Sequence, residues 1–313
     1  MDFVAIALTV AGLALFEIIS SIDNAVINAE VLTKMSEKAR RWFLRYGLLI
    51  AVFGIRLALP LVILMLANPA YTPVELLMSS FSDDPKTAQA VEASAPLLLA
   101  SGGVFLVFLF FHWLFLEPKA FGLHGEKFFF EQGVWFYAVV SALLAAVIWF
   151  ALPVNPLMAF AAVMGSTAFF IIHGFKQNAA EHERQMLEGK GSGHMSDWSK
   201  IFYLEAIDAT FSIDGVIGAF AYTMSIPLIV LGSGLGALVV REMTMRNIES
   251  VKRYRFLKNG AMYSVFFLGT VMLADAFGLH VPAYATPLVT FMIIGYFFYL
   301  SRTELKKAAP AVA

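Results

Sequence analysis

Cysteine is absent from the 313 residues, and charged residues are scarce. The absence of cysteine excludes disulfide bonds, thiolate metal sites and cysteine nucleophiles. Only 14% of the residues are charged, whereas a soluble domain of ordinary composition has about 25%. With 59% hydrophobic residues, a water-soluble fold would have too few polar side chains to cover its surface, a need that a bilayer removes. No basic cluster indicates nucleic-acid binding, and the composition therefore predicts an integral membrane protein.

Long hydrophobic runs make up most of the chain. A membrane-spanning helix needs about 20 mostly apolar residues. No basic segment precedes the first run, so we expect it to be a retained span and not a cleaved signal peptide. The runs predict an all-α polytopic membrane protein with about nine spans, near residues 3–24, 46–67, 95–116, 134–152, 157–176, 201–223, 226–242, 260–279 and 286–301.

Lysine and arginine gather in every second loop between these runs. The loops that separate the basic segments contain a single lysine, Lys86. Because short cytoplasmic loops carry the excess of Lys and Arg, we expect the N-terminus outside and the C-terminus inside, in a bacterial inner membrane. The basic segments are 33–46, 117–133, 176–200, 241–259 and the tail.

One sequence pattern occurs twice, in the first and sixth predicted spans. Residues 17–24 read EIISSIDN and residues 208–215 read DATFSIDG, so both contain acid-x-x-x-Ser-Ile-Asp. Each copy is followed by a span with an arginine, Arg56 or Arg241, and then by a third span. The copies lie five spans apart and therefore enter the membrane in opposite directions, which predicts an inverted 3+3 repeat of the kind common in secondary transporters.

The repeat predicts two membrane halves joined by a cytoplasmic linker. The linker contains a Gly/Ser run, and its histidines, His182 and His194, are expected to be solvated and not metal sensors. The expected divisions are a first half at 1–176 (repeat one 3–116, extra spans 134–176), a linker at 177–199, a second half at 200–301 (repeat two 201–279, last span 286–301) and a tail at 302–313.

Acidic residues inside the repeat motifs need a cation or a proton. A charged carboxylate in the membrane costs at least about 2.5–3.5 kcal/mol. Arg56 is expected to act as a counter-ion, which satisfies only some of the acids. Hard divalent cations prefer oxygen ligands, and the motifs contain no histidine or sulfur, which favours Mn²⁺, Mg²⁺ or Ca²⁺ over Zn²⁺ and Cu⁺. The oxygen-bearing candidates are Glu17, Ser21, Asp23, Asn24, Asp208, Ser212 and Asp214.

Helical spacing leaves two arrangements of these oxygens open. Glu17, Ser21 and Asn24 share one helix face, whereas Asp23 lies roughly 120° round an ideal helix. Either the helix unwinds at Ser-Ile-Asp, which we favour because Asn24 and Gly215 tolerate unusual dihedral angles, or each aspartate faces a different wall of the cavity.

The two motifs, together with Glu205 and the Gly-x-Arg56 span, resemble the TerC family of the lysine-exporter superfamily, closest to its less characterised bacterial relatives. The resemblance covers most of residues 10–280. It implies manganese(II) export and metal homeostasis, with a link to tellurite resistance. It also implies that Gly215 replaces a frequent serine, which leaves one ligand fewer. The metal site that it implies comprises Glu17, Asp23, Asn24, Asp208 and Asp214.

Four further residues have two interpretations each. Glu205 is either an entrance-side ligand or an interfacial glutamate. Asp275 is either an exit-side ligand or proton carrier, or a residue without that role. His112 and His173 are interpreted as snorkelling or satisfied core histidines near the cytoplasmic ends of their spans.

The sequence thus predicts a gradient-driven transporter of divalent metal ions, with Mn²⁺ as substrate and no permanently bound cofactor. A transporter of Ca²⁺ or a cationic solute is one alternative, and a non-transporting accessory membrane protein is another. An enzyme is not expected, because no nucleophile or histidine–carboxylate metal set lies beside the acids. The lipid bilayer and the metal ion are the expected partners, and an oligomer is compatible with the sequence.

Overall fold

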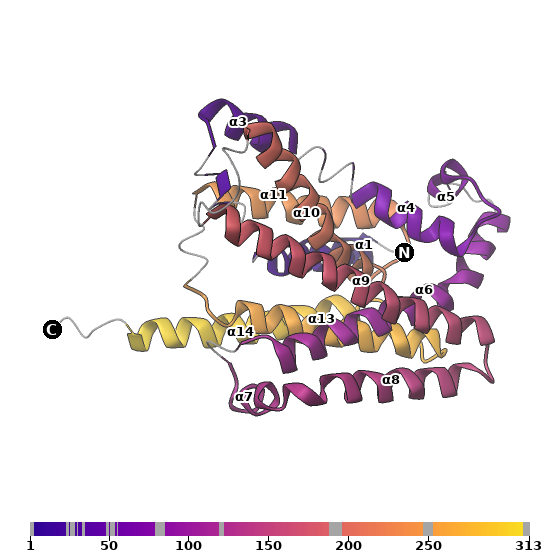
Figure 1. Ribbon diagram of the computed structural model, residues 1–313. Helices are drawn as coiled ribbons and strands as arrows, with labels where there is room; N and C mark the ends of the chain where they lie inside the picture. The colour runs from indigo at the N-terminus through magenta and orange to yellow at the C-terminus, as the bar shows by residue number, and fades with distance from the viewer. Residues whose placement is uncertain are drawn as a thin grey trace.

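Figure 1 shows the computed structural model, in which all described regular structure is helical. The described residues are 3–308 except 23–24, 26–28, 30, 33–34, 48–49, 51–53, 55, 79–84, 119–121, 188–195 and 247–252.

The α-helices follow the hydrophobic runs of the sequence. A π-helical turn, Phe43–Gly47, follows α3, and a short 3-10 helix, Gly133–Trp135, precedes α8. The α-helices are α1 (Phe3–Ser20), α3 (Glu37–Trp42), α4 (Arg56–Ala67), α5 (Pro73–Met78), α6 (Pro85–Leu116), α7 (His124–Glu131), α8 (Phe136–Ala151), α9 (Pro156–Leu187), α10 (Asp197–Ala219), α11 (Ile226–Arg246), α13 (Leu257–Ala276) and α14 (Ala285–Ala308).

Seven helices of the described part are long and apolar enough to cross a membrane. The remaining two predicted spans fall on α4, which is 12 residues long, and on α10, which carries Glu205, Asp208 and Asp214. Composition alone therefore supports seven spans. The seven stretches are 3–20, 92–116, 133–151, 156–178, 226–243, 257–276 and 285–307.

Helix α6 lies at the centre of the bundle and packs against α9 and α13. Its contact with α13 is close because two glycines face each other: a Cβ added to Gly103 would lie 3.0 Å from the carbonyl oxygen of Gly269. On the α9 side, Phe105 and Phe108 pack edge-on against Phe169. Small residues that let backbones approach are the usual basis of helix packing in membranes.

Helix α1 packs in the same way against α11. An added Cβ at Gly232 would lie 2.5 Å from Cβ of Leu13, and one at Gly236 would lie 2.6 Å from Cβ of Glu17. Within the GxGxG sequence of α11 at residues 232–236, Gly232 and Gly236 are the glycines that pack against α1, and two small residues four positions apart form a common packing face of membrane helices. Because Gly236 abuts Glu17, the same packing fixes the position of a buried carboxylate.

Replacing Gly236 by alanine should lower the free energy of unfolding by about 1–3 kcal/mol, because the new methyl group would also lie 2.7 Å from the carbonyl oxygen of Ala14. Gly295 of α14 is the matched control, since an added Cβ there meets nothing within 4 Å. Gly295→Ala should be neutral or stabilising by about 0.5–1 kcal/mol. Unfolding in detergent micelles measures both, and equal effects of the two substitutions would contradict the close contact.

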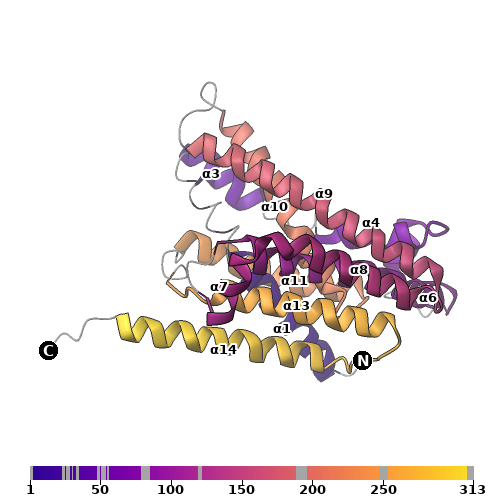
Figure 2. The same cartoon turned by 60° about the horizontal axis from the view of Figure 1, so that its bottom comes forward.

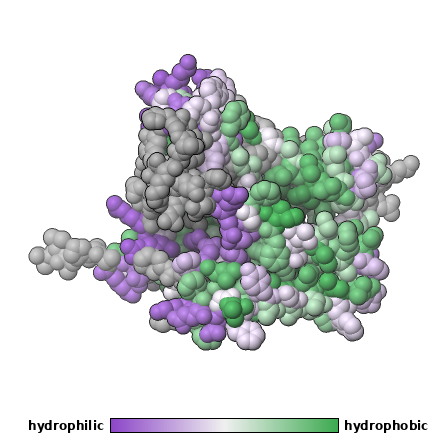
Figure 3. All heavy atoms as spheres, viewed as in Figure 1, coloured by the Kyte–Doolittle hydropathy of each residue, from purple (hydrophilic) through white to green (hydrophobic). Residues whose placement is uncertain are grey.

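The two ends of the bundle differ in polarity. Helices α3 and α7 and the end of α14 lie at one end, whereas α5 and the α8–α9 and α13–α14 connections lie at the other (Figures 1 and 2). Hydrophilic residues gather at the first end and apolar residues cover the rest of the visible face (Figure 3). The first end holds α3, with Arg40 and Arg41 in its last turn, α7, with Lys127, and the basic last turn of α14.

Candidate cation centre

Three charged side chains from three helices meet inside the bundle. Arg56, at the start of α4, and Glu17, near the end of α1, are each 3% exposed. Nη2 of Arg56 donates a hydrogen bond to Oε1 of Glu17, and Nη1 lies 3.9 Å from Oδ2 of Asp208 in α10. Two carboxylates from the two sequence motifs therefore share one guanidinium group, which we call the Arg56 centre.

Neighbouring residues from α10, α11 and the end of α1 hold the Glu17 side chain in place. Oγ of Ser21 donates a 2.8 Å hydrogen bond to Oε1 of Glu17. Gly236 of α11 packs against the stem of the glutamate, and an added Cβ at Gly215 of α10 would lie 3.1 Å from its Oε2. The absence of a side chain at Gly215 thus leaves space beside a carboxylate oxygen, at the position where the TerC resemblance implies a lost ligand.

Glu205 lies one helical turn before Asp208. It packs against Gly47 of the π-helical turn, and both of its carboxylate oxygens are buried without a hydrogen bond in the described part of the chain. Arg241 is close enough to Glu205 to attract it electrostatically. Glu205, Glu17 and Asp208 thus place three carboxylates near Arg56 and Arg241, and Arg241 also lies near Glu242. Carboxylates gathered in this way favour a bound cation or a proton.

Asp214 is not part of the Arg56 centre. Its Oδ2 forms an ion pair with Nζ of Lys176 in α9, and its Oδ1 is buried without a hydrogen bond among the described residues. Helix α10 is continuous from Asp197 to Ala219, so the unwinding expected at Ser212-Ile-Asp214 is wrong. The alternative arrangement applies to this copy: the two aspartates of α10 face different partners, because they lie six residues apart on an intact helix.

The first motif is described only in part. Helix α1 ends at Ser20, immediately before Ser21, whose backbone N–H still bonds to the carbonyl oxygen of Glu17. Asp23 and Asn24, two of the predicted ligands, lie outside the described residues, as does His194 of the linker.

The other predicted residues are placed as follows. Ser212 is 6% exposed within α10. Oδ1 of Asp275 accepts a 2.7 Å hydrogen bond from the backbone N–H of Val281, which closes the turn after α13 and gives this carboxylate a structural role. Within the part of the chain that the structure describes, no group of three or more His, Asp or Glu side chains is arranged to hold a metal ion.

The start of α10 is anchored to the segment that follows α1. Ser36 caps α3, and both its hydroxyl and its backbone N–H donate to the carboxylate of Asp197. The hydroxyl bond lowers the pKa of Asp197 below its usual value. Trp42 packs edge-on against Trp198 with ring centroids 5.1 Å apart. These contacts join the segment that follows α1 to the start of α10, and so they hold together the parts of the chain that flank the two motifs.

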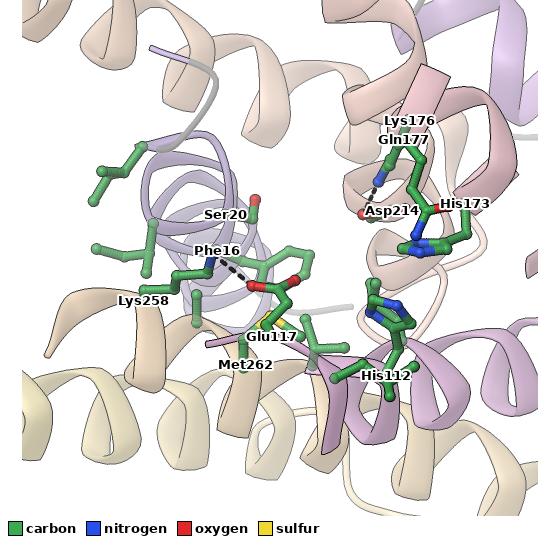
Figure 4. Close-up of a pocket in the computed structure, with 16 residues that line it drawn as sticks. Phe16, Ser20, His112, Glu117, His173, Lys176, Gln177, Asp214, Lys258 and Met262 are labelled. Carbon is green, nitrogen blue, oxygen red and sulfur yellow. Dashed lines mark hydrogen bonds and ion pairs between the residues drawn. The ribbon is translucent and has the colours of Figure 1, made fainter. Parts of the chain in front are cut away.

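A cavity of about 500 Å³ lies beside α10, bordered by α1, α6, α9 and α13. Asp214 and Lys176 line one side, and a second ion pair, between Lys258 and Glu117 at 2.8 Å, lines the other (Figure 4). Two histidines, His112 and His173, lie next to the first pair (Figure 4). Sequence reasoning missed this cluster because its members lie far apart in the chain and form no motif.

The apolar helices and the buried charged centre define the class: a multi-pass helical membrane protein with ionisable groups inside its bundle. The chain belongs to a family described as "Protein of unknown function (DUF475)", whose model matches residues 22–307. It is similar to the uncharacterized membrane protein YceF of Bacillus subtilis (strain 168), with 25% identity over 85 residues. That match covers 27% of this chain and 33% of YceF. No solved structure matches the chain.

Proposed function

We propose that this protein transports divalent metal ions across a bacterial inner membrane, with Mn²⁺ as the expected substrate. The observation that carries the proposal is the Arg56 centre, in which Glu17 and Asp208 from two copies of one motif share a buried guanidinium group. The single positive charge of Arg56 faces two carboxylates, an arrangement that favours a further cation or a proton nearby.

Helix packing supports an inverted repeat as the scaffold. If α1, α4 and α6 form one repeat and α10, α11 and α13 the other, a pseudo-two-fold axis requires reciprocal contacts. Helix α1 contacts α10 and α11, α4 contacts the same two helices, and α6 contacts α13. The reciprocal pairs α1 with α13 and α10 with α6 are also present. Substrate sites of such transporters lie where the repeats meet, which is the position of Arg56.

The polarity of the two ends supports the proposed topology of nine spans, N-terminus outside and C-terminus inside. The basic helix α3, helix α7 and the basic last turn of α14 share one end, and α5 and the α8–α9 and α13–α14 connections, which are poor in Lys and Arg, share the other (Figure 1). In this arrangement the two further spans are those of α4, which is apolar but only 12 residues long, and of α10, which carries Glu205, Asp208 and Asp214. Charged residues inside a span are expected of a membrane-embedded ion pathway.

The chemistry of transport follows from exchange of one cation for another. In the structure the guanidinium of Arg56 lies beside both Glu17 and Asp208 and carries one positive charge against their two negative charges. A divalent ion that replaces it brings a higher charge, and the carboxylates and the Ser21 hydroxyl are hard oxygen ligands suited to Mn²⁺, Mg²⁺ or Ca²⁺. Asp23 and Asn24 are proposed to complete this centre, whereas Asp214 is not counted in it because Lys176 is its partner. The TerC resemblance supports Mn²⁺ among these ions.

A non-transporting accessory membrane protein is the second candidate, because Glu17, Asp208 and Asp214 each have a basic neighbour. Transport of Ca²⁺ or a cationic solute on the same scaffold is the third.

Flux measurements with the purified full chain in phospholipid vesicles separate the three candidates. We expect Mn²⁺ to cross the membrane under an imposed pH gradient, faster than Mg²⁺ and Ca²⁺ and faster than in vesicles without protein. Preference for Ca²⁺ would replace the expected substrate. The absence of flux for every ion, from protein that elutes as a single species, would favour the accessory role.

A further inference from the structure

Two histidines from different helices meet on the wall of the cavity beside α10. The rings of His112 in α6 and His173 in α9 have centroids 3.7 Å apart and planes inclined by 51°. His112 is 7% exposed, and Nε2 of His173 is buried without a hydrogen bond in the described part of the structure. An ionisable side chain within a membrane-spanning helix is a candidate for an ion pathway or a proton relay.

The charges that face this pair are nearly balanced. Lys176 lies one turn after His173 on α9 and pairs with Asp214 of α10. Across the cavity, Lys258 of α13 pairs with Glu117 at the end of α6 (Figure 4). From α8, the ring of Phe136 packs edge-on against His112 and contributes no charge. Two cations and two anions cancel, so the protonation state of the histidines sets the net charge of the cavity.

The close contact limits the pair to one proton. A second positive charge on a ring 3.7 Å away would be strongly repelled, so the two imidazoles titrate as one coupled unit. A divalent metal ion is a less suitable occupant than a proton, since Lys176 faces the same space and the described residues offer no third protein ligand.

We propose that the His112–His173 pair binds the proton that is exchanged for the transported cation; this inference rests on the transport function proposed above. An imidazole nitrogen accepts the proton from the aqueous phase, and only one N–H bond forms. The imidazolium then lies beside the Lys176–Asp214 ion pair, where it repels the ammonium group and attracts the carboxylate. Release of Lys176 loosens the contact between α9 and α10.

Helix α10 connects the proton site to the Arg56 centre. Asp214 and Asp208 lie on the same uninterrupted helix, so a shift of α10 at Asp214 also moves Asp208 relative to Arg56. Proton binding and cation binding therefore both act on the position of α10. A shared element that both sites influence is the physical requirement for coupling between separate sites. Coupling of this kind typically changes the affinity of the second ligand by about 5- to 150-fold.

The test compares two Mn²⁺ assays in vesicles that contain the full chain. The first measures uphill Mn²⁺ transport driven by a pH gradient, and the second measures exchange of labelled for unlabelled Mn²⁺ at equal pH. In the double variant His112→Gln, His173→Gln we expect uphill transport to fall by about 5-fold or more while exchange is retained. His280→Gln is the control, because this histidine is exposed and bonded to the carbonyl oxygen of Gly278 in the α13–α14 connection.

Three results have distinct meanings. Uphill transport that survives in the double variant overturns the proton site. Loss of exchange together with uphill transport also overturns it, because the histidines then serve folding or the cation path. If the double variant does not insert, His112→Gln and His173→Gln are each measured in the same way. Absence of both activities from the unsubstituted protein means instead that the proposed transport function fails.

Discussion

Replacing Arg56 by methionine should lower the free energy of unfolding by about 3–5 kcal/mol, because it removes the only base that the structure shows within 4 Å of Glu17 among the described residues. Methionine keeps much of the volume of the side chain, so the loss reports on charge more than on packing. The buried carboxylate of Glu17 then has no base within 4 Å among the described residues. Unfolding of purified protein in mixed micelles measures the change.

Three companion experiments test the cause of this loss. Arg56→Lys keeps the charge without the planar fork and should be intermediate. Arg56→Met combined with Glu17→Gln should recover part of the stability, because one uncompensated charge is removed. Added Mn²⁺ should stabilise Arg56→Met more than the unsubstituted protein. The variant should gain about 2.7 kcal/mol when free Mn²⁺ is at a hundredfold excess over its dissociation constant. Equal stability of the single and double variants would contradict the ion-pair explanation.

Much of the framework could be predicted from the sequence because membrane proteins follow few rules. Hydrophobic length located the seven apolar helices, and the spacing of Glu17 and Asp208 relative to Ser-Ile-Asp identified two acids that the structure brings to Arg56. The GxGxG packing of α11 was also predictable, since glycine inside an apolar span has few other uses.

The remaining features depend on helix rotation and on contacts between distant segments. A repeated Ser-Ile-Asp suggested that both copies unwind, yet α10 is continuous, and Asp214 faces Lys176 in place of the Arg56 centre. Pairing of Asp214 with a lysine from the predicted linker boundary has no sequence signal. The contact of His112 with His173 likewise results from the packing of α6 on α9, which no local pattern reports.

The largest effect on transport is expected from Glu17→Gln and Asp208→Asn. Each should reduce Mn²⁺ flux by at least about 10- to 100-fold, because substitution of a residue that only orients a metal ligand already has an effect of that size. Each amide keeps the size of the acid and one acceptor oxygen but lacks the charge that attracts a cation. Glu17→Gln can still accept the hydrogen bonds of Ser21 and Arg56, so the fold should persist. Glu304→Gln is the matched control, since that acid pairs with Lys307 on the exposed end of α14.

The decisive comparison is between flux and stability in the same preparations. If these acids form a cation site, flux falls much further than the folded fraction does, because the neutral variants still satisfy Arg56 in part. If the acids only hold α1, α4 and α10 together, the midpoint falls and any residual flux follows the folded fraction. Unchanged flux in both Glu17→Gln and Asp208→Asn would place the cation path away from Arg56, because each variant removes one of the two carboxylates that are proposed to bind the ion.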